Sequence, residues 1–281
     1  MATSAEQHSL EIGSGKRFSF GSNWSKFLRR LDTGRIRQAE QDLQSFLNVE
    51  RLDGKTFIDV GSGSGLSSLA ARRLGATVHS FDFDPDSVAC TAELRQRYSS
   101  DDPSWNVASG SVLDDGYIVS LGQWDIVYSW GVLHHTGSMW KALDNASKLV
   151  KQDGVLFVAI YNDQGRSSRS WLRVKRLYCA LPSALRFLVV GPAMLRLWGP
   201  TVLRDLLRGN PLRSWNNYAG QGFRGMDPWR DAVDWIGGLP FEVATPEAIF
   251  DFYRSRGYSL TKMSTCGGGI GCNQFVFKRS A

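Results

Sequence analysis

Apolar and polar residues follow two regular patterns along this chain. Short apolar runs rich in β-branched and aromatic residues are typical of buried strands. Seven such runs occur, at KTFIDVG (55–61), TVHSFDF (77–83), WNVASGSV (105–112), WDIVYSW (124–130), GVLFVAIYN (154–162), YSLTKMST (258–265) and NQFVFKR (273–279). Helical patterns separate most of them, and this alternation predicts an α/β fold with a mostly parallel sheet covered on both faces.

The helical patterns carry recognisable ends. They cover residues 64–75, 84–98, 138–150 and 245–257. Gly75 is a natural C-terminal cap, and Asp84–Pro85 and Thr245–Pro246 each place a capping side chain before a proline in the first turn. In the third pattern, one helical face collects four apolar residues: Met139, Leu143, Ala146 and Val150.

The rhythm of strands and helices breaks for some 80 residues after position 162. The last two strands can pair antiparallel through the glycine-rich loop between them, which predicts a seven-stranded, mostly parallel sheet with one antiparallel edge strand. We therefore expect four segments: an N-terminal helical cap segment (1–50), a ligand-binding core (51–162), a helical lid or substrate insertion (163–244), and a C-terminal helix with the last two core strands (245–281).

Composition limits the class of protein. The 281 residues are 42% hydrophobic, enough for a full core, and no apolar run reaches the roughly 18 residues of a membrane span. The polar N-terminus has no secretory signal, so a cytoplasmic protein is expected. The four scattered cysteines, Cys90, Cys179, Cys266 and Cys272, predict reduced thiols, and the spacing of the last two matches no common zinc pattern.

Positive charge is concentrated in one segment. The net charge is +6, but residues 163–224 hold eleven Arg or Lys and two Asp, a local excess of nine that leaves the other 219 residues at −3. Because the basicity belongs to the insertion and not to the core, no general nucleic-acid-binding surface is expected.

A glycine-rich turn follows the first strand in DVGSGSG, with glycines at 61, 63 and 65. Glycine lets the backbone turn sharply and approach a ligand, and the next helix presents unpaired N–H groups at its start. Asp82 ends the second strand, 21 positions after Gly61, where a carboxylate can accept hydrogen bonds from both hydroxyls of a ribose. A nucleotide-like ligand is indicated.

The spacing of the glycines resembles that of a known cofactor-binding motif. The dinucleotide fingerprint requires G-x-G-x-x-G, but position 66 is Leu, and the G-x-G-x-G found here resembles motif I of the class I S-adenosylmethionine-dependent methyltransferases. The resemblance covers residues 55–162 and 245–279. It implies a Rossmann-like sheet and S-adenosyl-L-methionine as cofactor, with S-adenosyl-L-homocysteine as product.

The resemblance also assigns cofactor contacts. Those to the methionine end and its glycine loop are Asp59, Gly61, Ser62, Gly63 and Gly65. Asp82 would bind the ribose and Phe83 the adenine. Ser111 and Val112 stand at the end of the third strand, where the family commonly has an acidic residue facing the adenine. Trp130 and Gly131, at the end of the fourth strand, would lie beside the transferable methyl.

Two adjacent histidines follow that strand. The ubiquinone-biosynthesis type of small-molecule methyltransferase commonly reads Leu-Glu-His where this chain reads Leu133-His134-His135. An imidazole could remove the proton of a hydroxyl acceptor, which would make His134 and His135 candidate catalytic bases. Alternatively, one packs against the cofactor and the other anchors the next helix. A metal site is less favoured, because no third ligand is near.

Substrate contacts are expected from the additions to the sheet. Phe20 and Trp24 would close over the cofactor, or would only dock the first helix. Tyr161, Asn162 and Arg166 follow the fifth strand and are the substrate-side candidates. The basic, amphipathic run 184–209 is interpreted as a lid in preference to a helix lying on an anionic membrane.

The sequence thus predicts a methyltransferase acting on an oxygen or nitrogen of a small molecule, with a natural product or a lipid-like compound among the acceptors considered. The alternatives are a nicotinamide-dependent oxidoreductase on the same sheet and a non-catalytic nucleotide-binding module. The expected partner is the methyl acceptor and not nucleic acid. The oligomeric state stays open, with a homodimer among the alternatives.

Overall fold

The computed structural model describes residues 4–29, 31–100, 102–218 and 228–280. The chain divides into two compact units. The first holds Met1–Ser9, Ser19–Gly165 and Pro240–Ala281, and the second holds Leu10–Phe18 and Arg166–Leu239. The predicted insertion, 163–244, overlaps the second unit, and its residues 219–227 lie outside the described ranges, as do residues 1–3 and 30 of the predicted cap segment.

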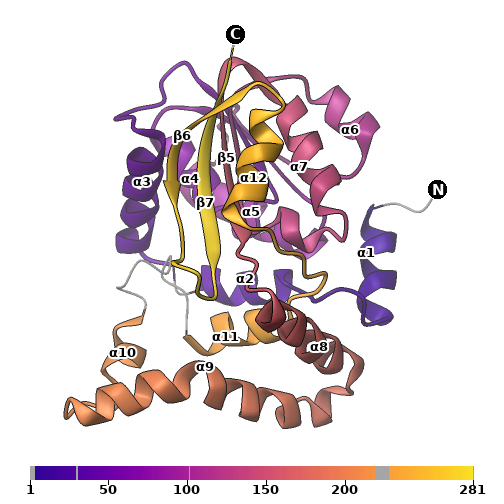
Figure 1. Cartoon of the computed structure of the whole chain (residues 1–281). Coiled ribbons are helices and arrows are strands. Elements are labelled where there is room, and N and C mark those ends of the chain that lie inside the picture. The colour runs from indigo at the N-terminus through magenta and orange to yellow at the C-terminus, as the bar shows by residue number, and fades with distance from the viewer. Residues whose placement is uncertain (1–3, 30, 101, 219–227, 281) are drawn as a thin grey trace. The chain divides into compact units, whose positions relative to one another are not determined.

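The first unit is built on a seven-stranded sheet (Figure 1). Its strands are β1 (Thr56–Val60), β2 (Thr77–Asp82), β3 (Trp105–Ser109), β4 (Trp124–Trp130), β5 (Val150–Tyr161), β6 (Tyr258–Ser264) and β7 (Cys272–Arg279). They lie in the order β3-β2-β1-β4-β5-β7-β6. The pairs among β1 to β5 are parallel, which confirms the predicted Rossmann-like α/β fold.

The reversed strand lies one position inside the edge. β7 pairs antiparallel with β5 on one side and with β6 on the other, so β6 forms the edge. The sequence correctly predicts that β6 and β7 pair but places the antiparallel strand at the edge. The correction has a physical reason: β7 is buried on both faces, with Phe275 and Phe277 inaccessible on one face and Val276 3% exposed on the other, whereas most of β6 is exposed.

Helices cover both faces of this sheet (Figure 1). One face carries α3 (Thr33–Leu47), α4 (Leu66–Arg73) and α5 (Pro85–Tyr98), and α2 (Gly21–Leu28) packs on α5. The other face carries α6 (Asp115–Ser120), α7 (Met139–Lys148) and α12 (Pro246–Arg254). The short 3₁₀ turn η1 (Leu133–His135) follows β4, and α1 (Ser4–Gly13) begins the chain.

Local capping explains several helix starts. Asp84 accepts a hydrogen bond from Asp86 N–H at 2.9 Å, and Thr245 Oγ1 accepts one from Ala248 N–H at 3.3 Å, so both predicted caps are confirmed. The helical pattern predicts that Val150 continues the apolar face of α7. The structure shows otherwise, because α7 ends at Lys148 and Val150 begins β5.

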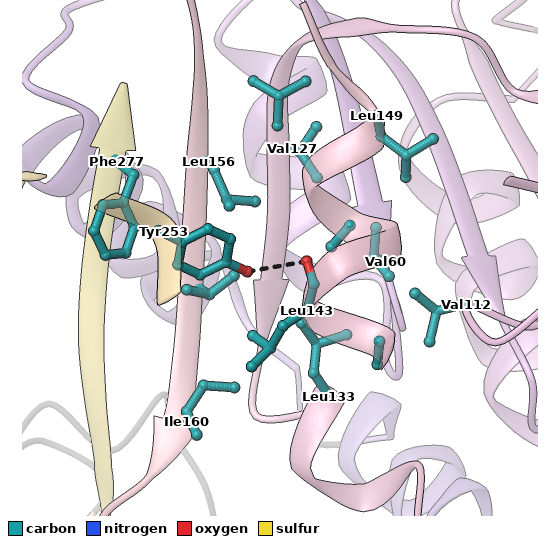
Figure 2. Packing of buried hydrophobic residues seen from close by; sticks show 14 of the residues in the cluster. Val60, Val112, Val127, Leu133, Leu143, Leu149, Leu156, Ile160, Tyr253 and Phe277 are labelled. Carbon is teal, nitrogen blue, oxygen red and sulfur yellow. Dashed lines mark hydrogen bonds between the residues drawn. The ribbon is translucent and has the colours of Figure 1, made fainter. Parts of the chain in front are cut away.

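The main core lies between the sheet and the helices α6, α7 and α12 (Figure 2). Leu143 and Leu133 pack there against side chains of β1, β4 and β5, and Tyr253 of α12 points its hydroxyl at the backbone of α7, donating a hydrogen bond to Leu143 O at 3.3 Å. This core fixes the carboxyl ends of the strands, where a ligand site is expected.

The second unit is helical. It contains α8 (Arg166–Ala180), the turn η2 (Ser183–Leu185), α9 (Phe187–Leu207), α10 (Arg213–Asn216) and α11 (Pro228–Gly237). Lys175 of α8 is inaccessible to solvent: its Nζ donates to Trp235 O and lies 4.5 Å from the centroid of the Trp235 ring. Burial lowers the pKa of Lys175 to about 7. Among the described helices, none is long and apolar enough to cross a membrane.

Candidate functional site

The turn after β1 has a backbone that favours glycine. Gly61, Gly63 and Gly65 all have positive φ, at 81°, 55° and 78°. Phe81 O accepts hydrogen bonds from Gly61 N–H and Ser62 N–H at 2.9 and 3.1 Å, which ties the turn to β2. Ser62 Oγ lies 2.9 Å from Thr91 Oγ1 of α5. Hydrogen bonds to β2 and α5 therefore fix the conformation of this turn, although its three glycines have no side chains.

Asp82 lies beside this turn at the end of β2. Its Oδ2 accepts a hydrogen bond from Gly63 N–H and its Oδ1 accepts one from Asp84 N–H, both at 2.9 Å. Burial raises the pKa of Asp82 to about 6, an effect that these two N–H donors oppose. The structure thus brings the predicted ribose carboxylate and the glycine turn into direct contact.

The residues expected near the adenine are less directly placed. The sequence predicts that Ser111 and Val112 lie at the end of the third strand. In the structure β3 ends at Ser109, so both residues lie in the following loop. Ser111 Oγ accepts a hydrogen bond from Leu113 N–H at 3.2 Å, and the Val112 side chain belongs to the core. Phe83 is half-buried, with the ring of His8 edge-on at 5.6 Å.

Asp59 is buried beneath the turn. A chain of hydrogen bonds reaches it from three other elements: Trp105 Nε1 donates to Ser80 Oγ, Ser80 Oγ to Ser68 Oγ, and Ser68 Oγ to Asp59 Oδ2 at 2.6 Å. With 2% of its surface exposed, Asp59 supports the turn from below. Its direct contact with a ligand stays a prediction.

The end of β4 opens onto free space. Gly131 has φ +73°, and a Cβ built on it would meet no described atom within 4 Å. Trp130, just before it, donates its indole N–H to Gln274 Oε1 of β7 at 3.0 Å. The expected place of Trp130 and Gly131 beside the transferable methyl stays a prediction.

The two histidines make different hydrogen bonds. His134 Nδ1 accepts from the backbone N–H of Tyr161 at 3.3 Å, and its ring contacts that of Tyr161 at a tilt of 32°, with centroids 3.9 Å apart. Since a neutral imidazole has one acceptor nitrogen, the proton of neutral His134 is on Nε2.

His135 has the opposite tautomer. Its Nδ1 lies 2.6 Å from Pro240 O, and a carbonyl oxygen can only accept, so Nδ1 carries the proton. Nε2 of neutral His135 is then the nitrogen that can accept a proton. The His135 side chain is buried, with the ring of Phe20 4.7 Å away and that of Tyr161 5.2 Å away.

Residues 240–244 hold the histidine turn from outside. Glu242 N–H donates to His134 O at 3.0 Å, and the Glu242 carboxylate accepts from Met139 N–H at 3.0 and 3.1 Å, at the start of α7. Burial raises the pKa of Glu242, against those donors. Further along, Ala244 N–H donates to Tyr161 O at 3.0 Å.

The aromatic pair of the N-terminal segment reaches both halves of the site. A Cβ on Gly63 would lie 3.2 Å from the indole of Trp24, so Trp24 covers the glycine turn. Phe20, which directly precedes α2, packs its ring against that of His135. α2 itself is held down by Gly21 N–H, which donates to Asp84 Oδ2 at 2.8 Å.

The substrate-side candidates divide. Tyr161 lies with the histidines, as described. Asn162 is buried: its amide donates to Gly269 O and its Oδ1 accepts from Asn273 Nδ2 at 3.0 Å, which makes it a support of the glycine-rich 266–271 loop. Arg166 is exposed and begins α8 in the second unit. Its contact with substrate stays a prediction.

Sequence reasoning misses several residues of this region. These are His8, Thr91, Val132, Pro240 and Glu242. Each acts through a contact with a residue far away in the chain, which the local sequence does not reveal. Only Val132 stands inside a motif that the sequence singles out, directly before Leu133-His134-His135.

Comparison with known protein families gives a consistent result. A family model described as a methyltransferase domain matches residues 31–198. The ubiquinone biosynthesis O-methyltransferase of Xanthomonas campestris pv. campestris (strain B100) is 29% identical over 188 residues, which cover 64% of this chain and 70% of that protein.

A second relative matches a shorter part of this chain. The ribosomal protein L11 methyltransferase of Bacillus cereus (strain Q1) is 34% identical over 113 residues, 40% of this chain, and the match spans 31% of that protein. Among solved structures, magnesium protoporphyrin IX methyltransferase from Synechocystis PCC 6803, with bound S-adenosylhomocysteine, has a TM-score of 0.53 at 16% identity, over 94% of this chain and 98% of that one. This likeness shows a shared fold.

Proposed function

The chain belongs to the methyltransferase-domain family and is a class I S-adenosylmethionine-dependent methyltransferase, and we propose that it methylates an oxygen or nitrogen of a small-molecule acceptor. The family excludes the nicotinamide-dependent alternative. The cofactor supplies, when bound, a methyl group on a positively charged sulfur, which is electrophilic without further activation.

The residues of the site fit this cofactor. The three positive-φ glycines give the Gly61–Gly65 turn a backbone without side chains at those positions, and the Asp82 carboxylate lies next to that backbone. We propose that the loop holds the methionine end, that Asp82 accepts the ribose hydroxyls and that Phe83 packs on the adenine. Trp24, which already lies over Gly63, would exclude water from this side.

Two observations favour a small acceptor. The relative with the longer overlap is named for ubiquinone biosynthesis, whereas the one named for a ribosomal protein overlaps less of this chain. Moreover, the rings of Phe20 and Tyr161 lie against the two histidines, and the ring of Phe241 lies against Tyr161, a setting that suits a compact, partly aromatic molecule.

The hydrogen bond between His135 Nδ1 and Pro240 O carries the mechanistic part of the proposal. It fixes the tautomer in which His135 Nε2 can take the proton of a hydroxyl acceptor. His134 uses its one acceptor nitrogen on Tyr161 N–H, so we propose that it positions the turn and does not act as the base.

Matched asparagine variants test these roles. His135→Asn keeps a side-chain N–H for Pro240 O but removes the acceptor at Nε2, whereas His134→Asn keeps an acceptor for Tyr161 N–H. With labelled methyl donor and a series of phenols, His135→Asn should lower kcat by about 10²- to 10⁴-fold, and His134→Asn by much less. S-adenosylhomocysteine affinity, measured by calorimetry, should change little in either.

The acidity of the phenol separates a base from a structural role. Phenols that are already ionised at the assay pH need no base, so the loss in His135→Asn should shrink as phenol pKa falls. An equal loss for all phenols would refute the base role of His135. Absence of transfer to any phenol, carboxylate or amine by the wild-type protein would refute the small-molecule acceptor.

A further inference from the structure

The outer face of α8 carries a row of arginines. Arg166, Arg169, Arg173 and Arg176 are spaced by three and four residues, all are exposed, and none forms an ion pair with a described residue. The opposite face buries Trp171, Lys175 and Tyr178. Like charges at this spacing repel one another, so the row is unfavourable unless an anionic partner faces it.

The segment that contains α8 and α9 has almost no acidic residue of its own to balance this charge. Residues 166–218, all of which the structure describes, contain ten Arg or Lys and a single acidic residue, Asp205. Asp205 is 3% exposed and accepts hydrogen bonds from Ser214 N–H and Ser214 Oγ at 2.7 and 3.0 Å. Its charge is therefore turned inward, and the outer surface of this segment is cationic.

The same segment exposes large apolar side chains. Nine of the sixteen exposed large hydrophobic residues in the described structure fall between 177 and 212: Leu177, Leu185, Phe187, Leu188, Leu195, Leu203, Leu206, Leu207 and Leu212. On α9, Leu188, Leu195 and Leu206 recur at intervals of 7 and 11 residues, which return to one face of a helix. A monomeric soluble protein rarely leaves such a stripe uncovered.

We propose that α8 and α9 form a surface that docks on a phospholipid bilayer containing anionic lipid. The leucine stripe would enter the boundary between head groups and acyl chains, and the arginine row would bind the head groups. Leu177 lies on the same face as Arg173, one turn along α8, so apolar and basic groups are intermixed as such binding requires.

Other partners suit this surface less well. A nucleic acid would pair with the arginines but would leave the leucines in water. A second copy of this chain would bring two cationic faces together. The sequence alone favours a lid, and the exposed leucines of α9 are the observation that favours the membrane alternative. This docking does not depend on which acceptor is methylated.

Vesicle co-sedimentation of the full chain tests the proposal. Binding should be strong to phosphatidylcholine vesicles that contain phosphatidylglycerol, weak to phosphatidylcholine alone, and should fall as salt rises. An arginine near an anionic surface contributes roughly a factor of five in partitioning, so Arg169→Glu/Arg173→Glu should lower it by at least about 25-fold. Leu195→Gln/Leu206→Gln should lower it by about 10-fold or more.

Matched controls on the first unit isolate the surface. Arg37→Glu/Lys55→Glu changes the net charge equally at two exposed sites, and Val119→Gln replaces an exposed apolar residue of α6. Both should retain wild-type partitioning within about twofold, and all variants should keep their S-adenosylhomocysteine affinity and melting temperature.

Three results would overturn the proposal. The first is equal binding to neutral and anionic vesicles, and the second is equal losses in the control variants. The third is duplex DNA binding that competes with vesicles and is unaffected by Leu195→Gln/Leu206→Gln, which would assign the surface to nucleic acid instead.

Discussion

Val132 lies directly over Gly61. A Cβ built on Gly61 would come within 2.3 Å of Val132 Cγ1, and the φ of Gly61 is +81°, so glycine is needed for both space and conformation. This contact joins the turn after β1 to the turn after β4. The glycine loop and the histidine turn therefore constrain each other.

Gly61→Ala should damage cofactor binding through both effects. The methyl group would collide with Val132 and force a residue with a Cβ into the left-handed region, at about 1–2 kcal/mol for the latter alone. We expect the Kd for S-adenosylhomocysteine, measured by calorimetry, to rise at least about 10-fold. Val132→Gly removes the collision but not the conformational cost, so the double variant should recover part of the affinity. A Gly61→Ala variant with wild-type affinity would contradict this account.

Asp82→Asn should weaken binding without unfolding the protein. The side-chain NH₂ of Asn would face one of two backbone N–H donors, Gly63 or Asp84, and the charge that we propose attracts the ribose hydroxyls would be lost. A loss of roughly 10- to 100-fold in affinity is expected, corresponding to one or two charge-assisted hydrogen bonds. Conversion of Glu40 on α3 to Gln, remote from this site, serves as the control. An unchanged affinity in Asp82→Asn would remove Asp82 from the cofactor site.

The raised pKa of Asp82 makes a pH prediction. The folded value, about 6, lies above the ordinary value of 3.8, so the folded protein holds this proton more tightly than the unfolded chain. The contribution of Asp82 to stability is therefore lost as pH rises from about 4 to 6. If the ionised carboxylate accepts hydrogen bonds from the ribose hydroxyls, as we propose, cofactor binding has the opposite sign, and affinity should fall as pH drops below about 6. Calorimetry across this range should show the fall in the wild type and a flat profile in Asp82→Asn.

Glu242 should act on stability and turnover together. Its carboxylate accepts Met139 N–H at the start of α7, and its own N–H holds His134, two residues beyond the Pro240 carbonyl that binds His135. Glu242→Ala should lower the free energy of unfolding by about 1–2 kcal/mol and reduce kcat. Glu242→Gln keeps an acceptor oxygen and should be milder in both. Urea denaturation and turnover of the pair check this, and a stable, fully active Glu242→Ala would show that residues 240–244 do not support the turn.

Ser68→Ala tests the support beneath the glycine loop. The variant removes the hydroxyl that donates to the buried Asp59 carboxylate and accepts from Ser80. A hydrogen bond to a charged group is worth about 1.5–3 kcal/mol, so the melting temperature should fall clearly. Ser120→Ala removes an exposed hydroxyl bonded only to the local backbone at Tyr117 and should change stability by less than about 0.5 kcal/mol. Equal effects of the two substitutions would mean that the network contributes nothing.

Local sequence signals predict many individual elements well. Thr245–Pro246 and Asp84–Pro85 begin helices because capping involves atoms only two or three residues apart. The β1 apolar run and the glycines after it predict the first strand and its tight turn for the same reason. The errors occur where distant chain segments compete, as at Val150, which joins β5 and not α7, and at β7, which inserts between β5 and β6.

The division at the site follows the same physics. The sequence by itself determined the glycine turn, the carboxylate at Asp82, the adjacent histidines and the arginine spacing of α8, because each depends on neighbours in the chain. Only the tertiary structure decided the two tautomers, with the proton on Nδ1 in His135 and on Nε2 in His134, since Pro240, the partner of His135, is 105 residues away. It likewise decided that the α9 leucines are exposed and the Asp205 charge is hidden. Tautomer, burial and exposure are set by packing between segments, and sequence spacing does not encode them.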